Sequence, residues 1–296
     1  MAIFHCSVKS VNRKDGRSAP AAAAYRAGER IMNDRTGRAH DYRLKQRGIV
    51  HKEIVFPKGV AAMSRPALWN LAEAAEKRVD AKTAREYELA LPDELPAPWR
   101  AEVARRFARE IVRRYGVVAD ICIHKPNTKG DQRNHHAHIL TTTRTVTAKG
   151  FGEKTRILDS PRTSGKEVEE IRAIWERICN TALEKVGSLE RVDRRTLKAQ
   201  GIDRQPTTHL GPSATEMERR GVKTERGAMN RSISWNDVEE LARDKARFEK
   251  LKGGIEQARR RIAHRKATKA RLEYQRQRKQ EERKPQQNIA NHGKSR

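Results

Sequence analysis

VVADICIHKPNTKGDQRNHHAHIL, residues 117–140, contains two apolar segments separated by a polar loop. Residues 117–124 form a β-branched run that is typical of a strand, and residues 135–146 resume the same pattern. The ten residues between them, 125–134, are too few for a crossover helix. We therefore expect the two strands to be antiparallel neighbours, which sets the direction of the sheet around them.

The same stretch holds four of the ten histidines of the chain. Because side chains alternate along a strand, His136 and His138 face one side and His135 faces the other. Pairing of the two strands brings His124 opposite or diagonal to that pair. Three neutral imidazoles bind divalent transition metals and leave coordination positions open, which is typical of catalytic sites. We predict a metal site of His124, His136 and His138; the alternative is a group of surface histidines that contact phosphate.

A carboxylate is expected to orient at least one of these imidazoles, because metal-bound histidines ordinarily donate their second ring N–H to an acceptor. Three acids lie on the neighbouring predicted strands, namely Glu86, Glu88 and Asp120. Glu86 and Glu88 are two residues apart and share a face. The sequence does not choose among the three, and a solvated edge position is the alternative for each.

The remaining elements of the first two thirds of the chain mix strands and helices. Further strands are predicted at residues 2–9, 48–56 and 85–91, and further helices at residues 64–78, 98–115 and 166–185. A short helix follows Ser18, a good N-cap residue, and carries Pro20 in its first turn, then four alanines and Tyr25. This order predicts an α+β fold, an antiparallel sheet with helices mainly on one face.

The charge of the chain indicates an acidic partner. Lys and Arg number 65 against 38 Asp and Glu, which gives a formal net charge of +27. Nucleic acid is the usual partner of such an excess, because each neutralised phosphate releases counterions. Candidate phosphate contacts, each with a solvated surface charge as the alternative, are Arg105, Arg106, Arg113, Arg114, Arg191, Arg194 and Arg195.

A membrane is a poor alternative partner. The basic stretches lack the Trp, Phe and Leu that an interfacial helix carries on its apolar face. No run approaches the roughly 18 apolar residues of a spanning helix. Residues 1–9 contain no apolar segment typical of a signal peptide. We therefore expect a cytoplasmic protein without membrane insertion.

The composition changes near residue 216. Residues 241–296 contain 19 Lys and Arg against 6 Asp and Glu, and few apolar side chains follow Ile262. Such a segment does not bury enough apolar surface to fold compactly by itself. We predict a domain at residues 1–215 that carries the chemistry. We predict a basic extension at residues 216–296, helical at first and disordered after Pro285.

The setting of Tyr25 carries a family resemblance. Alone, a tyrosine after four alanines is ordinarily a helix anchor, but SAPAAAAYRAGER, residues 18–30, resembles the N-terminal motif of the MobA/MobL family of relaxases. The histidine segment resembles the metal motif of that family. DRRTLKAQGIDRQPTTHLGPSATEMERRG, residues 193–221, resembles a block that follows its catalytic core. The resemblance covers residues 1–226.

The resemblance implies an HUH endonuclease fold and a plasmid mobilisation relaxase in which Tyr25 is the nucleophile. Such an enzyme nicks one DNA strand at the origin of transfer, keeps a covalent 5′-phosphotyrosyl link and rejoins the strand after conjugative transfer. The resemblance also implies Mg²⁺ or Mn²⁺ as cofactor and plasmid DNA, single-stranded around the nick, as substrate. Other mobilisation proteins and a type IV secretion coupling protein are implied as partners.

Two other functions fit parts of the sequence. One is a basic accessory protein that binds the transfer origin or RNA without cutting it. The other is a rolling-circle replication initiator, which would also use histidines and a tyrosine. In initiators of the wider superfamily the tyrosine follows the histidines, whereas Tyr25 precedes them here. This order disfavours the initiator.

Overall fold

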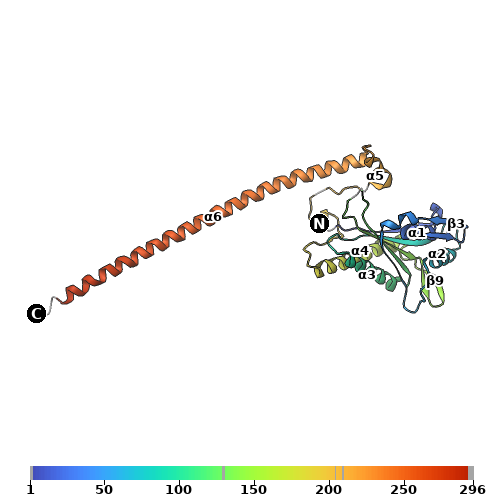
Figure 1. Ribbon diagram of the computed structural model, residues 1–296, viewed down its shortest axis with the longest axis horizontal. Coiled ribbons are helices and arrows are strands. Elements are labelled where there is room, and N and C mark those ends of the chain that lie inside the picture. Colours follow the sequence, from blue (N-terminus) through green and yellow to red (C-terminus); the bar gives the residue numbers. More distant parts are fainter. Residues whose placement is uncertain (1–2, 129–130, 204, 209, 293–296) are drawn as a thin grey trace. The chain divides into compact units, whose positions relative to one another are not determined.

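The computed structural model (Figure 1) describes residues 3–128, 131–203, 205–208 and 210–292. Contacts divide the chain into two compact units, Met1–Thr196 and Leu197–Arg296. Every strand in the described part of the chain belongs to the first unit, which also contains Tyr25 and the grouped histidines.

Five antiparallel strands form the central sheet, in the order β1-β5-β7-β6-β4. Their bounds are β1 (Cys6–Asn12), β4 (Ile49–Val55), β5 (Lys82–Ala90), β6 (Ala119–His124) and β7 (His136–Thr142). β6 and β7 pair antiparallel, which confirms the predicted hairpin. The first strand begins and ends later than the predicted residues 2–9, because Val11 is fully buried whereas Ile3 is exposed. Residue 2 lies outside the described residues.

Two short hairpins have no counterpart in the sequence-based prediction. They are β2 (Arg30–Asn33) with β3 (Arg38–Asp41), and β8 (Arg144–Thr147) with β9 (Gly150–Lys154). In the first hairpin Ile31 is the one buried apolar side chain, so no apolar alternation marks these strands. Gly37, with a φ of +66°, supplies the left-handed conformation that its turn requires.

Helices cover both faces of the sheet. The long helices α3 (Ala97–Tyr115) and α4 (Pro161–Lys185) pack on one face, where Phe107 and Trp175 join a core with Ile139. The short helices α1 (Ala19–Ala27) and α2 (Arg65–Ala74) pack on the other, where Trp69 joins a second core with Leu140. The helical mass therefore lies mainly on one face, and the α+β prediction is confirmed.

Both ends of α1 are fixed by local structure. The Ser18 hydroxyl accepts a hydrogen bond from the Ala21 amide at 3.3 Å, which confirms the predicted N-cap. The helix ends at Gly28, whose φ is +60°. A Cβ at this glycine would lie 2.8 Å from the Ile49 side chain and 2.9 Å from the Gln46 backbone. Glycine therefore fits where other residues do not, and the end of the tyrosine-bearing helix is defined.

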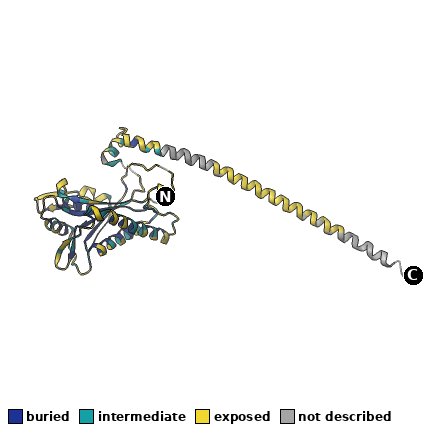
Figure 2. Cartoon of the chain, turned by 180° about the vertical axis from the view of Figure 1, so that it is seen from behind, coloured by how far each residue is buried: buried dark blue, intermediate teal, exposed yellow. Residues whose placement is uncertain are grey.

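The second unit consists of η3 (Lys198–Gln200), α5 (Gly211–Arg219) and the 68-residue helix α6 (Glu225–His292). The described side chains of α6 beyond residue 246 are exposed (Figure 2). The helix continues through Pro285, where the sequence predicted disorder, because the Glu, Gln, Lys and Arg residues before it are good helix formers. Residues 293–296 lie outside the described residues. Nowhere in the described chain is a helix both long and apolar enough to span a membrane.

Candidate functional site

Three histidines meet on the face of the sheet that α1 and α2 cover. The register places His124 opposite His136, and His138 opposite Cys122 on the same pair of strands. The ring centroids are 4.8 to 5.4 Å apart. One ring nitrogen from each of the three residues lies within 4.8 Å of the others. We call these three residues the histidine cluster; the structure brings together the residues that the strand phase selected.

Each ring of the histidine cluster donates one hydrogen bond to a fixed acceptor. His138 Nδ1 donates to Glu86 Oε1 at 2.7 Å, and His136 Nδ1 donates to the carbonyl of Asn134 at 3.0 Å. His124 Nε2 donates to the carbonyl of Arg26 at 2.7 Å. A neutral imidazole that donates from one nitrogen carries a lone pair on the other. This donor set fits a divalent metal ion, with the oriented rings that such sites require.

Burial keeps two rings of the histidine cluster, those of His124 and His136, in the neutral form that binds metal. Burial lowers the pKa of His124 to about 4, against a smaller opposing effect of the Arg26 carbonyl. Burial also lowers the pKa of His136 below its ordinary value. Both rings are therefore neutral at pH 7, which is the protonation state that binds metal.

Glu86 is the carboxylate that orients the cluster. Besides accepting from His138, its two oxygens form a buried, bidentate ion pair with the Arg26 guanidinium. Burial alone would raise the pKa of this carboxyl, but the hydrogen bonds from His138 and Arg26 hold it well below its ordinary value. Glu86 is therefore ionised at pH 7 and fixes the tautomer of His138.

The other two candidate acids have different partners. Glu88 pairs with Lys9 of β1 at the surface of the sheet. Asp120 is buried and accepts hydrogen bonds from Arg65 at 2.7 Å and from the Trp69 indole at 2.9 Å. Within the described part of the chain, neither acid shares a hydrogen bond with the histidine cluster.

Tyr25 projects from the solvent-facing side of α1, whose alanines are buried apart from Ala21, and 42% of the surface of Tyr25 is exposed. Its hydroxyl accepts a hydrogen bond from Lys45 Nζ at 3.0 Å. The Tyr42 ring packs edge-on at 5.2 Å between centroids. The next residue in the chain is Arg26, whose carbonyl holds His124. The candidate nucleophile thus lies one residue from a direct contact with the histidine cluster.

A hollow of about 380 Å³ lies beside Tyr25, and we call it the tyrosine groove. Arg17, Arg38 and His40 bring positive or titratable nitrogen to its walls, and Tyr42 adds an aromatic ring. None of the described residues that line it is acidic. The charge of Arg26, which also lines it, is neutralised by Glu86. The groove is therefore suited to an anionic strand that carries flat bases.

Sequence reasoning missed Lys45, Arg38 and His40. They belong to residues 30–48, a polar stretch in which no apolar period marks an element. These three residues come close to Tyr25 only through the fold of the β2–β3 hairpin and of the 3₁₀ helix η2 (Arg43–Gly48). Composition gave one usable signal, the excess of cations with no acid between residues 42 and 48.

The arginines of α3 that the sequence suggested as phosphate contacts form ion pairs with glutamates. Arg105 pairs with Glu53 and Glu102, and Arg113 pairs with Glu110. Their helix packs on the face of the sheet opposite α1. Arg106 and Arg114 also pair with glutamates. The role of these four arginines as phosphate contacts stays a prediction. The same holds for Arg191, Arg194 and Arg195, of which Arg194 pairs with Glu176 and Arg195 with Asp193.

Comparisons with known proteins agree on one family. The MobA/MobL family model matches residues 17–220. The mobilization protein MobL of Acidithiobacillus ferridurans is 37% identical over 286 residues, which cover 87% of this chain and 75% of that protein. A probable conjugal transfer protein TraA of Sinorhizobium fredii is 36% identical over 75% of this chain, but the match spans only 22% of TraA.

A solved structure shares the fold of this chain. It is described as the molecular basis of vancomycin resistance transfer in Staphylococcus aureus, and it aligns with a TM-score of 0.58 at 29% identity. The alignment covers 66% of this chain and all of that structure. Because the family model covers most of the chain and MobL matches it over most of both lengths, this chain belongs to the MobA/MobL family.

Proposed function

We propose that the protein is a plasmid mobilisation relaxase, which nicks one DNA strand at an origin of transfer and later rejoins it. The observation that carries the proposal is the histidine cluster, with all three rings held by acceptors, placed one residue from the exposed Tyr25 through the Arg26 carbonyl. Membership of the MobA/MobL family supports the same function.

The chemical step that we propose is attack by the Tyr25 hydroxyl oxygen on the scissile phosphorus. The new bond joins this oxygen to phosphorus, the bond from phosphorus to the 3′ oxygen breaks, and the proton lost by the phenol balances the proton that the 3′ oxygen gains. The products are a 5′-phosphotyrosyl link and a free 3′-hydroxyl. One phosphodiester replaces another, so the reverse reaction rejoins a strand.

Lys45 supports the attack. Its ammonium group donates to the Tyr25 hydroxyl at 3.0 Å and lies 4.1 Å from the ring centroid. A positive donor at this oxygen stabilises the negative charge that develops as the phenol loses its proton. The tyrosine groove, through Arg17 and Arg38, would hold the phosphates on either side of the scissile one.

The histidine cluster would hold a divalent ion through the nitrogens that do not donate to protein acceptors. Those are Nδ1 of His124 and Nε2 of His136 and His138. When bound, the ion would neutralise charge on the scissile phosphate. The family resemblance favours Mg²⁺ or Mn²⁺, although all-imidazole ligation is softer than Mg²⁺ prefers.

The organisation that we propose keeps the chemistry within residues 1–215 and leaves residues 216–296 as a basic extension. DNA around the nick would be single-stranded, since a strand must enter the groove beside Tyr25 to react. Other mobilisation proteins and a type IV secretion coupling protein are the proposed partners in transfer.

The decisive test uses a supercoiled plasmid that carries the cognate origin of transfer. The wild-type protein should relax a fraction of the plasmid and stay attached to the new 5′ end, and Tyr25→Phe should abolish both results. Tyr42→Phe, which alters the adjacent ring, is the matched control and should keep both. Normal nicking by Tyr25→Phe would contradict the proposal. Binding without nicking by the wild type would favour an accessory protein, and loss of plasmid copying rather than of transfer would favour an initiator.

A further inference from the structure

A second positively charged hollow, of about 560 Å³, lies at the other end of β5 from the histidine cluster, and we call it the far hollow. Its walls come from the end of α2 with the loop that follows it, and from the β8–β9 hairpin with the segment after it. Its lining contains three carboxylates, those of Glu76, Asp80 and Asp159. Six cations line it as well, namely Lys77, Arg78, Lys82, Arg144, Lys154 and Arg156.

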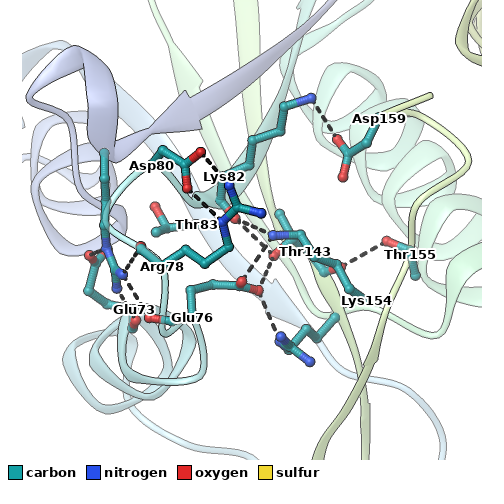
Figure 3. A network of polar contacts seen from close by, with 12 residues as sticks. Glu73, Glu76, Arg78, Asp80, Lys82, Thr83, Thr143, Lys154, Thr155 and Asp159 are labelled. Atoms are coloured by element: carbon teal, nitrogen blue, oxygen red, sulfur yellow. Dashed lines mark hydrogen bonds and ion pairs between the residues drawn. The ribbon is translucent and has the colours of Figure 1, made fainter. Parts of the chain in front are cut away.

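The carboxylates of the far hollow are already saturated by cations. Glu76 is buried and accepts from Arg144 at 2.9 Å and from Lys154 at 3.0 Å. Asp159 accepts from Lys82 at 3.0 Å and from the buried Arg85. Figure 3 shows the surroundings of Glu76 and the Lys82–Asp159 pair from close by. The carboxylates therefore hold the cations in place, and the lining keeps a net positive charge.

Two cations at the far hollow have no such partner. Lys77 and Arg156 are exposed, and among the described residues neither side chain forms an ion pair or a hydrogen bond. They come from different walls, one from the loop after α2 and one from the segment after β9. A concave site with a preorganised cationic floor and two free cations is suited to phosphate groups.

The far hollow is connected to the tyrosine groove by the short loop around η1 (Arg13–Asp15). The Arg13 guanidinium donates to the carbonyls of Glu76 at 2.7 Å and Arg78 at 2.8 Å, both in the wall of the far hollow. Three and four residues further along the chain, Gly16 and Arg17 line the tyrosine groove. Lys14, which lies in this loop between Arg13 and Gly16, is exposed and adds a further cation to the connecting segment.

The separation from the reacting centre follows from the strand register. Lys82 lines the far hollow, and Glu88, six residues along β5, lies opposite His138. At about 3.3 Å per residue the two sites are about 20 Å apart. This length corresponds to roughly six base-pair steps of a DNA duplex.

We propose that the far hollow binds backbone phosphates of the same DNA that enters the tyrosine groove, through Lys77 and Arg156. The proposal rests on the proposed function in that the DNA is the relaxase substrate. It adds an anchoring site, remote from the histidine cluster, that strengthens binding without taking part in cleavage.

The test measures DNA affinity as a function of salt for Lys77→Glu/Arg156→Glu in the full chain. The probe is a 30-base-pair duplex of arbitrary sequence, followed by fluorescence anisotropy. Loss of two phosphate contacts should reduce the slope of log K against log salt by about 1.8 and weaken binding by about tenfold or more near 0.1 M salt. Lys58→Glu/Arg109→Glu, which changes the charge equally at two other exposed cations, is the matched control.

Equal slopes for the double variant and its control would overturn the proposal, because the effect would then be one of net charge alone. The alanine pair Lys77→Ala/Arg156→Ala should give the same salt slope as the glutamate pair. A thermal melt of each variant shows whether it is folded. The readout is binding, so failure here is separate from failure of the proposed function.

Discussion

The histidine cluster stands on two central, paired strands, whereas Tyr25 stands on a nine-residue helix and faces solvent beside a short hairpin. The histidine rings are each held by an acceptor, and their acceptors are themselves buried or part of the backbone. The Tyr25 hydroxyl has one hydrogen-bond partner among the described residues, the exposed side chain of Lys45. Fixed ligands suit the proposed metal site, and an accessible hydroxyl suits the proposed reaction of Tyr25 with a DNA strand.

Removal of one ring from the histidine cluster should have the largest effect. His138→Ala should reduce Mn²⁺ affinity by more than the roughly 100-fold that loss of a second-layer hydrogen bond produces, because a ligand itself is lost. Titration calorimetry with Mn²⁺ measures the change. His135→Ala is the control on the same segment, since its ring contacts Asp93 and lies outside the cluster. Unchanged Mn²⁺ binding by His138→Ala would exclude the metal site.

Removing the charge that orients the cluster should have the next largest effect. Glu86→Gln should reduce Mn²⁺ affinity by about 10- to 100-fold. It also leaves the buried Arg26 guanidinium without its counter-charge, which costs about 3–5 kcal/mol of the free energy of unfolding. Glu88→Gln, on the same face of β5 but paired with the exposed Lys9, should change both quantities little.

The pH dependence of this variant sharpens the assignment. The folded-state pKa of Glu86 lies well below its ordinary value, so the stabilisation from its ionised form is complete above the unfolded pKa of about 4.3. It is lost as the pH falls from that value toward the depressed folded pKa. The difference in unfolding free energy between wild type and Glu86→Gln should therefore shrink below about pH 4. A difference that stays constant down to pH 2 would contradict the ion pair.

The histidine cluster was open to prediction because strand alternation and the pairing of adjacent strands are local properties of the sequence. The choice of Glu86 over Glu88 was not, since both share a face. The choice depends on Arg26, which is 60 residues away in the chain. The groove beside Tyr25 was also hidden, because Arg38 comes from a polar hairpin with one buried apolar side chain. Hydrophobic periodicity was enough to predict the fold class, but it did not predict which residues distant in the chain contact each other in the fold.

A smaller effect, on the nicking rate, is expected when Tyr25 loses its hydrogen bond from Lys45. Lys45→Met removes a charged hydrogen bond to the Tyr25 hydroxyl, worth about 1.5–3 kcal/mol. The rate of the nicking step should fall about 10- to 100-fold, while DNA affinity and Mn²⁺ affinity stay near wild type. Arg47→Met, at an exposed cation of the same 3₁₀ helix, is the control for loss of charge. A parallel fall in Mn²⁺ affinity would show that Lys45 also affects metal binding at the histidine cluster, so that the two sites are not independent.

The smallest effect is expected on the face of the sheet opposite Tyr25. Arg106 and Arg113 of α3 pair with glutamates at the surface, and such pairs contribute about 0–1 kcal/mol each. Because their charges are balanced locally, Arg106→Ala/Arg113→Ala should leave the salt slope of DNA binding within about 0.5 of the wild type. The matched pair Arg17→Ala/Arg38→Ala, in the tyrosine groove, should lower it by about 1.4 for single-stranded DNA. The reverse result would place the DNA across α3 and separate it from Tyr25, so this pair of slopes decides which face of the sheet the strand follows.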